Sequence, residues 1–161
     1  MRDLLEKTAR ERFGWDQLRA GQLEAMTAVI EGRDTLVVMP TGAGKSAIFQ
    51  VPALLLDGPT VVVSPLISLQ HDQVTGLLDS DAGPVGAREL NSTIRHGERE
   101  DIFAALAAGG LEYLFLTPEP LAKSDVMDRL AAAKPSLFVV DEAHCVASWG
   151  HDIALSGFVD K

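Results

Sequence analysis

Short runs of apolar residues alternate along this chain with segments in which apolar residues recur at helical spacing. A run that is apolar at nearly every position is typical of a strand buried on both faces of a sheet. Four such runs predict strands, whereas Val85–Asn91 is ambiguous and is compatible with a short strand. The four predicted strands are Thr35–Met39, Thr60–Ser64, Tyr113–Leu116 and Leu137–Val140.

Helices are predicted before and between these strands. Gly32 ends the second helix, Gly109 ends the fifth, and Pro52 is expected to kink the third because proline removes a helical hydrogen bond. The predicted helices span residues 3–12, 22–30, 44–56, 66–78, 94–108 and 125–133. Strands that alternate with helices indicate parallel βαβ units, so the predicted fold class is α/β, a parallel sheet with helices on both faces.

Composition narrows the possible functions. A chain of 161 residues has the length of one domain. Its single cysteine, Cys145, excludes an internal disulfide, and no apolar run reaches the roughly 18 residues of a membrane-spanning helix. No export signal is evident at the N-terminus. The net charge of −9 disfavours non-specific binding of nucleic acid, because phosphate contacts need lysine and arginine.

Residues 39–46 read Met-Pro-Thr-Gly-Ala-Gly-Lys-Ser between a predicted strand and a predicted helix. Glycines allow backbone N–H groups to converge on phosphate oxygens, and the helix N-terminus adds partial positive charge. Lys45 would reach the β and γ phosphates and Ser46 would hold Mg²⁺. The usual pattern begins with glycine where this chain has Met39, and an ordinary glycine-rich turn is the alternative. The residues assigned to nucleotide binding are Thr41, Gly42, Ala43, Gly44, Lys45 and Ser46.

Asp141-Glu142-Ala143-His144 follows the last apolar run. Asp141 would hold Mg²⁺ together with Ser46, and Glu142 would orient and polarise the attacking water as a general base. His144 could sense the γ-phosphate. Acidic residues at an ordinary helix N-terminus are the alternative. The phosphate cradle upstream in the chain favours the catalytic interpretation, with Lys45, Asp141, Glu142 and His144 as catalytic residues.

The segment Phe13–Asp152 resembles the first RecA-like motor domain, a P-loop NTPase domain, of RecQ-type DNA helicases in superfamily 2. The family's cradle commonly lacks the first glycine. Near Phe13 the chain matches the family's adenine-recognition segment, which implies that Trp15 stacks on adenine while Arg19 and Gln22 bind its edge or neighbouring groups. A Trp15 that only packs the first helix is the alternative.

Other matches to this family lie near its DNA-binding and coupling motifs. They imply contact with single-stranded DNA, or coupling of that contact to ATP hydrolysis, for Ser64, Gln70, Trp149 and His151. An indole can stack on a base for about 1–3 kcal/mol. The alternatives are a strand stop at Ser64, a core or surface Trp149 and a packed Cys145. The matching segments are Ser64–Gln73, Leu90–Ser92, Thr117–Glu119, Asp141–Cys145 and Trp149–Asp152.

The likeness stops after Asp152. We expect one RecA-like domain over residues 1–152, a divergent tail over residues 153–161, and no second RecA-like domain with its arginine finger. The chain would then be a fragment, poorly active alone, of an ATP- and Mg²⁺-dependent 3′-to-5′ DNA helicase. It would act in the cytoplasm and, if the source is a bacterium, would associate with the nucleoid. A related RNA helicase and a non-catalytic nucleotide-binding module are the alternatives.

Overall fold

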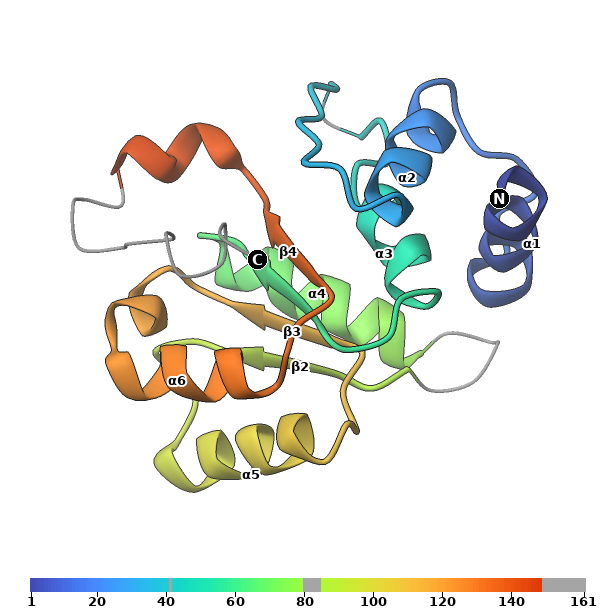
Figure 1. Cartoon of the computed structure of the whole chain (residues 1–161). Helices are drawn as coiled ribbons and strands as arrows, with labels where there is room; N and C mark the ends of the chain where they lie inside the picture. The colour runs from blue at the N-terminus through green and yellow to red at the C-terminus, as the bar shows by residue number, and fades with distance from the viewer. Residues whose placement is uncertain (41, 80–84, 149–161) are drawn as a thin grey trace. The chain divides into compact units, whose positions relative to one another are not determined.

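A computed structural model describes residues 1–40, 42–79 and 85–148 of the chain. Two compact units are present (Figure 1). Residues 1–57 belong to the first unit, and residues 58–79 with residues 85–148 belong to the second. The first unit carries the glycine-rich turn and the second carries the sheet.

The second unit contains a four-stranded sheet in the order β2-β3-β1-β4, and every pairing is parallel. This topology confirms the predicted parallel sheet. Three strands match the expected runs to within one residue, and the ambiguous segment does form a strand. The strands are β1 (Thr60–Val63), β2 (Ala87–Leu90), β3 (Tyr113–Leu116) and β4 (Leu137–Val140).

Helices cover both faces of this sheet, as predicted. Figure 1 shows α5 and α6 on one side of the sheet and α4 on the other. Glycine ends α5 as expected, since Gly109 has a φ of 71° just beyond the helix. The helical elements of this unit are α4 (Ile67–Leu78), α5 (His96–Ala107) and α6 (Ser124–Ala132), with the 3₁₀ turns η1 (Glu119–Ala122) and η2 (Ala143–Ser148).

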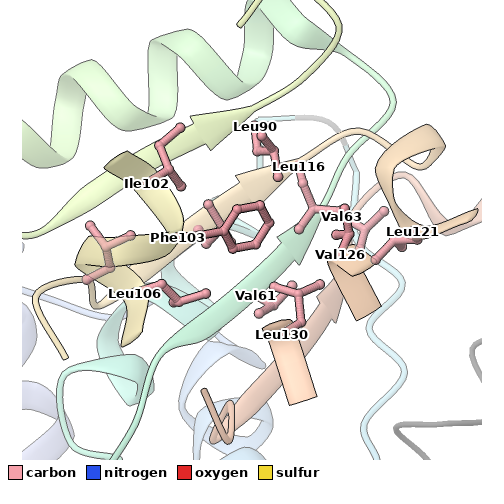
Figure 2. Packing of buried hydrophobic residues seen from close by; sticks show 12 residues of the cluster. Val61, Val63, Leu90, Ile102, Phe103, Leu106, Leu116, Leu121, Val126 and Leu130 are labelled. Carbon is pink, nitrogen blue, oxygen red and sulfur yellow. The ribbon is translucent and has the colours of Figure 1, made fainter. Parts of the chain in front are cut away.

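The face of the sheet toward α5 and α6 is apolar (Figure 2). Alternate positions of β1, such as Val61 and Val63, pack with Phe103 of α5 and Leu130 of α6. All four side chains are buried, with 5% or less of their surface exposed. Burying a side chain of this size stabilises the fold by about 1.5–3 kcal/mol, so this layer fixes which face of each strand points inward.

The first unit is helical where it is regular. Its helices are α1 (Arg2–Phe13), α2 (Gln22–Ile30) and α3 (Ala47–Ala53). They share a small core that includes Leu5, Met26 and Val51, each with no exposed surface. The first two helices match the predicted ranges closely. None of the described helices in either unit has the length and apolar character needed to cross a membrane.

The prediction of a strand at Thr35–Met39 is wrong. Residues 33–40 form no ladder with any strand in the described part of the chain. Leu36 and Val38 are 83% and 88% exposed, so this apolar run is not covered. An apolar run becomes a strand only where a neighbouring strand accepts its hydrogen bonds, and the run itself does not specify that neighbour.

The third helix is shorter than predicted. It begins at Ala47 because Gly44 has a φ of 83°, which a right-handed helix does not accept. It ends at Ala53, one residue after Pro52, so the proline lies in the last turn and does not kink the middle of a longer helix. The next residues continue in tighter turns, in which the Leu55 N–H donates to the Pro52 carbonyl at 2.8 Å.

Candidate nucleotide-binding site

The glycine-rich turn presents backbone amides that lack a backbone acceptor among the described residues. Gly42 and Gly44 have φ values of 77° and 83°, a conformation that glycine adopts without steric cost. The N–H groups of Gly44, Lys45 and Ser46 have no backbone acceptor within the described part of the chain. Thr41, which the sequence also assigns to this turn, lies outside the described residues. Three successive free amides form the kind of concavity that binds anions.

Gln22 holds this turn from α2. Its Nε2 donates to the Gly44 carbonyl at 2.9 Å, and its Oε1 accepts from the Arg19 N–H at 2.6 Å. A Cβ on Gly44 would lie 2.6 Å from Gln22 Nε2, which is shorter than side-chain contacts allow. A side chain at this position would therefore displace the end of Gln22, and the φ of 83° disfavours any residue with a Cβ. The side chain of Gln22 is 4% exposed, so the contact is internal.

Arg19 contacts the same turn. Its guanidinium donates to the Gly42 carbonyl at 2.6 Å. The family resemblance implied that Arg19 and Gln22 bind the adenine edge or neighbouring groups, and the structure shows that both contact the glycine-rich turn, Gln22 from α2 and Arg19 from the residues before it. Sequence reasoning missed these contacts, because the bonds join residues more than twenty positions apart. Their contact with adenine stays a prediction.

Lys45 and Ser46 lie at the junction of the turn and α3. The Lys45 ammonium donates to the Met39 carbonyl at 3.2 Å, and the side chain is half-buried. A triphosphate would offer this ammonium a stronger, charged acceptor. The Ser46 side chain makes no capping hydrogen bond with α3, so its hydroxyl is not committed to the helix terminus.

Trp15 packs beside the turn that follows α1. Its ring stacks on Phe13 with centroids 4.6 Å apart and planes inclined by 15°. It also lies against the small core of the first unit and is half-buried. One side of the indole therefore packs within the first unit, which was the alternative to stacking on adenine. The predicted stacking on adenine would use the remaining surface of the ring.

In the second unit, Asp141 continues the ladder beyond β4. Its N–H donates to the Val63 carbonyl at 2.8 Å, which fixes the carboxylate at the carboxyl edge of the sheet. This edge is where ligands bind to open α/β sheets. The Asp141 Oδ1 accepts from the Glu142 N–H at 2.9 Å, so the two acids are joined through one local turn.

Glu142 has a φ of 51°, in the left-handed region that costs a non-glycine residue about 1–2 kcal/mol. Its Oε2 lies 3.3 Å from Nδ1 of His144, whose side chain is 75% exposed. Glu142 thus contacts both Asp141 and His144, and the catalytic roles assigned to these three residues stay predictions. Cys145 is half-buried, and nothing nearby marks it as a nucleophile.

The two residues assigned to Mg²⁺ offer a hydroxyl and a carboxylate. Oxygen donors of this kind are the ligands that Mg²⁺ prefers, so the chemistry of the pair fits the ion. Ser46 belongs to the first unit and Asp141 to the second. Their joint role stays a prediction. Among the described residues, no cluster of three or more His, Cys, Asp or Glu side chains could hold a metal ion by itself.

The residues assigned to DNA are placed in part. Ser64 and Gln70 are 1% and 0% exposed, and the Gln70 Nε2 donates to the Ser64 carbonyl at 2.7 Å. Buried side chains of this kind fit coupling better than direct contact with DNA. Trp149 and His151 lie outside the described residues.

Residues 19–160 match the family model described as DEAD/DEAH box helicase. The chain is 38% identical over 148 residues to a probable ATP-dependent DNA helicase RecS of Bacillus subtilis, covering 92% of this chain and 29% of the relative. It is 41% identical over 140 residues to an ATP-dependent DNA helicase RecQ of Pasteurella multocida, covering 87% and 22%. A RecQ helicase of Bacillus subtilis is 42% identical over 141 residues, covering 87% and 23%. The chain spans about a quarter of the length of these relatives.

Proposed function

This chain belongs to the DEAD/DEAH box helicase family, and we propose that it is the N-terminal ATP-binding part of an ATP-dependent 3′-to-5′ DNA helicase of the RecQ type. Support comes from the names of the relatives, all of them DNA helicases, and from the glycine-rich turn with its free amides. The protein would act on DNA in the cytoplasm, with the nucleoid if the source is bacterial.

The residues with proposed roles in nucleotide binding and hydrolysis lie in both units. The amides of Gly44, Lys45 and Ser46 would bind phosphate oxygens, and the Lys45 ammonium would exchange the Met39 carbonyl for the β and γ phosphates. When bound, Mg²⁺ supplies positive charge that stabilises the phosphoryl oxygens during transfer. Ser46 and Asp141 would hold this ion.

Hydrolysis would depend on Glu142 and His144. The Glu142 carboxylate would accept a proton from the attacking water, which is the role of a general base. His144, 3.3 Å from that carboxylate, would respond to the γ-phosphate and shift with its loss. We propose that single-stranded DNA is contacted near residues 64–73 and by Trp149 and His151, and that a second RecA-like domain is needed to complete the catalytic site.

Free amides beside Lys45 carry this proposal, so the deciding experiment is nucleotide binding. A fluorescent ATP analogue should bind the wild-type chain, and Lys45→Ala should weaken binding at least about tenfold, since one charge-assisted contact is worth about 1.5–3 kcal/mol. Lys7→Ala is the matched control, because Lys7 is an exposed lysine of the same unit. Equal affinity of wild type and Lys45→Ala for the analogue would rule out the assigned cradle.

A further inference from the structure

The two faces of the sheet have different chemistry. The face toward α5 and α6 carries the apolar cluster described above. The opposite positions, on the side of α4, include the buried polar residues Ser64, Asn91 and Thr117. These three residues, here named the polar row, follow β1, β2 and β3 directly. They are 1%, 6% and 3% exposed, so water on the outside of the molecule does not solvate them.

Strand register places the members of the polar row side by side. Leu116 of β3 is in register with Val63 of β1 and Leu90 of β2, and each of these residues directly precedes one member of the row. The ladder of backbone hydrogen bonds continues past the strands. The Ser64 N–H donates to the Leu116 carbonyl at 3.0 Å, and the Thr117 N–H donates to the Leu90 carbonyl at 3.3 Å. Neighbouring strands lie about 4.8 Å apart, so adjacent side chains of the row are close enough to share one bridging molecule.

Four atoms around this row have no hydrogen-bond partner within the described part of the chain. They are Ser64 Oγ, Thr117 Oγ1, Asn91 Nδ2 and Oε1 of Gln70, which reaches the row from α4. Leaving one such atom unsatisfied costs about 1–3 kcal/mol, and native proteins rarely leave several together. The row therefore needs a polar partner that the side chains in the described part of the chain do not provide.

Donor and acceptor roles at the two amides are fixed by their other bonds. Asn91 Oδ1 accepts from the Thr93 N–H at 3.0 Å, so its Nδ2 is the unpartnered donor. Gln70 Nε2 donates to the Ser64 carbonyl at 2.7 Å, so its Oε1 is the unpartnered acceptor. The two hydroxyls, which can donate or accept, complete a complementary set.

At the same interface between α4 and the sheet, unpartnered atoms that can only accept outnumber those that can only donate. Gln73 Oε1 on α4 and Glu89 Oε2 on β2 are also buried without a partner in the described residues. Acceptors cannot satisfy one another, and Asn91 Nδ2 is the one obligate donor among the unpartnered atoms named here. A small molecule that both donates and accepts fits this imbalance.

We propose that the polar row and Gln70 form a buried hydration site, in which ordered water joins α4 to the carboxyl ends of β1, β2 and β3. Water is small enough for the spacing, supplies the missing donors and makes about three hydrogen bonds in such sites. The Asp141 N–H donates to the carbonyl of Val63, and Val63 directly precedes Ser64 in the chain. The site therefore adjoins the backbone segment that holds Asp141. On the proposed function, it would link the segment near DNA to the proposed magnesium ligand.

Water can be detected directly. We expect long-lived water to give nuclear Overhauser contacts with the Thr117 amide in the wild-type chain, and a crystal structure at high resolution to show water within hydrogen-bond distance of Thr117 Oγ1. Thr117→Val should abolish both signals. Thr75→Val, at an exposed position of α4, should leave both unchanged. A dry interface, or a cation in place of water, would overturn the proposal.

Energetic coupling gives a second test. Thr117→Val and Gln70→Met each remove one polar partner while conserving most of the volume. Each substitution should raise the equilibrium constant for unfolding by some factor. If water bridges the two residues, the factor for the double variant should be at least about threefold smaller than the product of the two single factors. Factors that multiply within twofold would contradict a shared water network. Ser64→Ala replaces Gln70→Met in the cycle if the latter does not fold.

A functional readout separates this inference from the proposed function. The gain in affinity for the ATP analogue on adding Mg²⁺ should fall severalfold in Thr117→Val and stay at the wild-type value in Thr75→Val. An unchanged gain in Thr117→Val would remove the link to Asp141. Failure of the Lys45→Ala experiment would reject nucleotide binding itself, while the water contacts would still decide whether the hydration site exists.

Discussion

Gly44 is a residue at which both backbone conformation and space restrict the side chain. Its φ of 83° disfavours every residue with a Cβ, and Gln22 occupies the position that a Cβ would take. The sequence pattern predicted a glycine-rich turn here from residue types alone. It could not predict the contact with Gln22, because that contact depends on how α2 packs against α3.

Gly44→Ala should therefore lower the free energy of unfolding by about 1–3 kcal/mol, through unfavourable φ and displacement of Gln22. Gly76→Ala is the matched control, since Gly76 lies in α4 with open space around it. That substitution should stabilise the chain by about 0.5–1 kcal/mol, because alanine favours a helix. Urea denaturation followed by circular dichroism measures both, and effects of the same sign would contradict the argument.

Glu142 offers a second test of backbone conformation. Its φ of 51° strains any side chain that carries a Cβ, so Glu142→Gly should be more stable than Glu142→Ala by about 1 kcal/mol. Both variants lack the carboxylate and should be equally inactive. A comparison of their urea midpoints isolates the backbone term. Equal midpoints would mean that the left-handed conformation is not maintained in solution.

At the scale of elements, α5 and α6 are joined by charge and by one aromatic ring. The Arg129 guanidinium carbon lies 4.8 Å from the centroid of Phe103, and the same side chain donates to Glu100 at 2.9 Å. Arg99 donates to Asp125 at 2.8 Å. Both ion pairs are at least partly exposed to solvent and contribute little, whereas the buried ring packs in the core of the second unit.

Phe103→Leu keeps an apolar side chain but removes the aromatic face beneath Arg129. We expect a loss of about 1–2 kcal/mol in unfolding free energy. In a double-mutant cycle with Arg129→Met, about 0.5–1 kcal/mol of that loss should depend on Arg129. Arg33→Met, at an exposed position of the first unit, is the control and should show no coupling with Phe103→Leu.

The same scale explains which elements the sequence could predict. Apolar runs identified β1, β3 and β4, because each is bounded by polar, glycine or proline residues and each has a neighbour in the sheet. The run Thr35–Met39 looked alike yet forms no ladder in the described part of the chain. Ala87–Leu90 was ambiguous because β2 is an edge strand, in which Arg88 and Glu89 interrupt the apolar pattern.

At the scale of the whole molecule, the short span relative to the RecS and RecQ relatives limits the expected activity. An arginine finger supplied by a second domain is worth about 10³–10⁵ in rate. The 161-residue chain should therefore bind the ATP analogue but hydrolyse ATP at least about a thousandfold more slowly than an intact helicase. A phosphate-release assay with single-stranded DNA measures this, and turnover close to that of a full-length relative would refute it.

Charge at this scale bears on how DNA would be bound. With 14 basic against 23 acidic residues, the chain can neutralise few phosphates. Affinity for nucleic acid should then come from stacking and from further positive charge outside this chain. The sequence predicted the family from local motifs, whereas the joining of the cradle to Asp141 and Glu142 stays a prediction, because the cradle belongs to the first unit and both acids to the second.

One feature of the sheet has a practical consequence. Among the described strands, β4 pairs with β1 alone, so this half-buried apolar strand forms one edge of the four-stranded sheet. An exposed edge strand can pair with extended segments of other polypeptides. At high concentration the purified chain should therefore aggregate, and its light scattering should increase with time. Biochemical assays of this chain will then require dilute, cold samples.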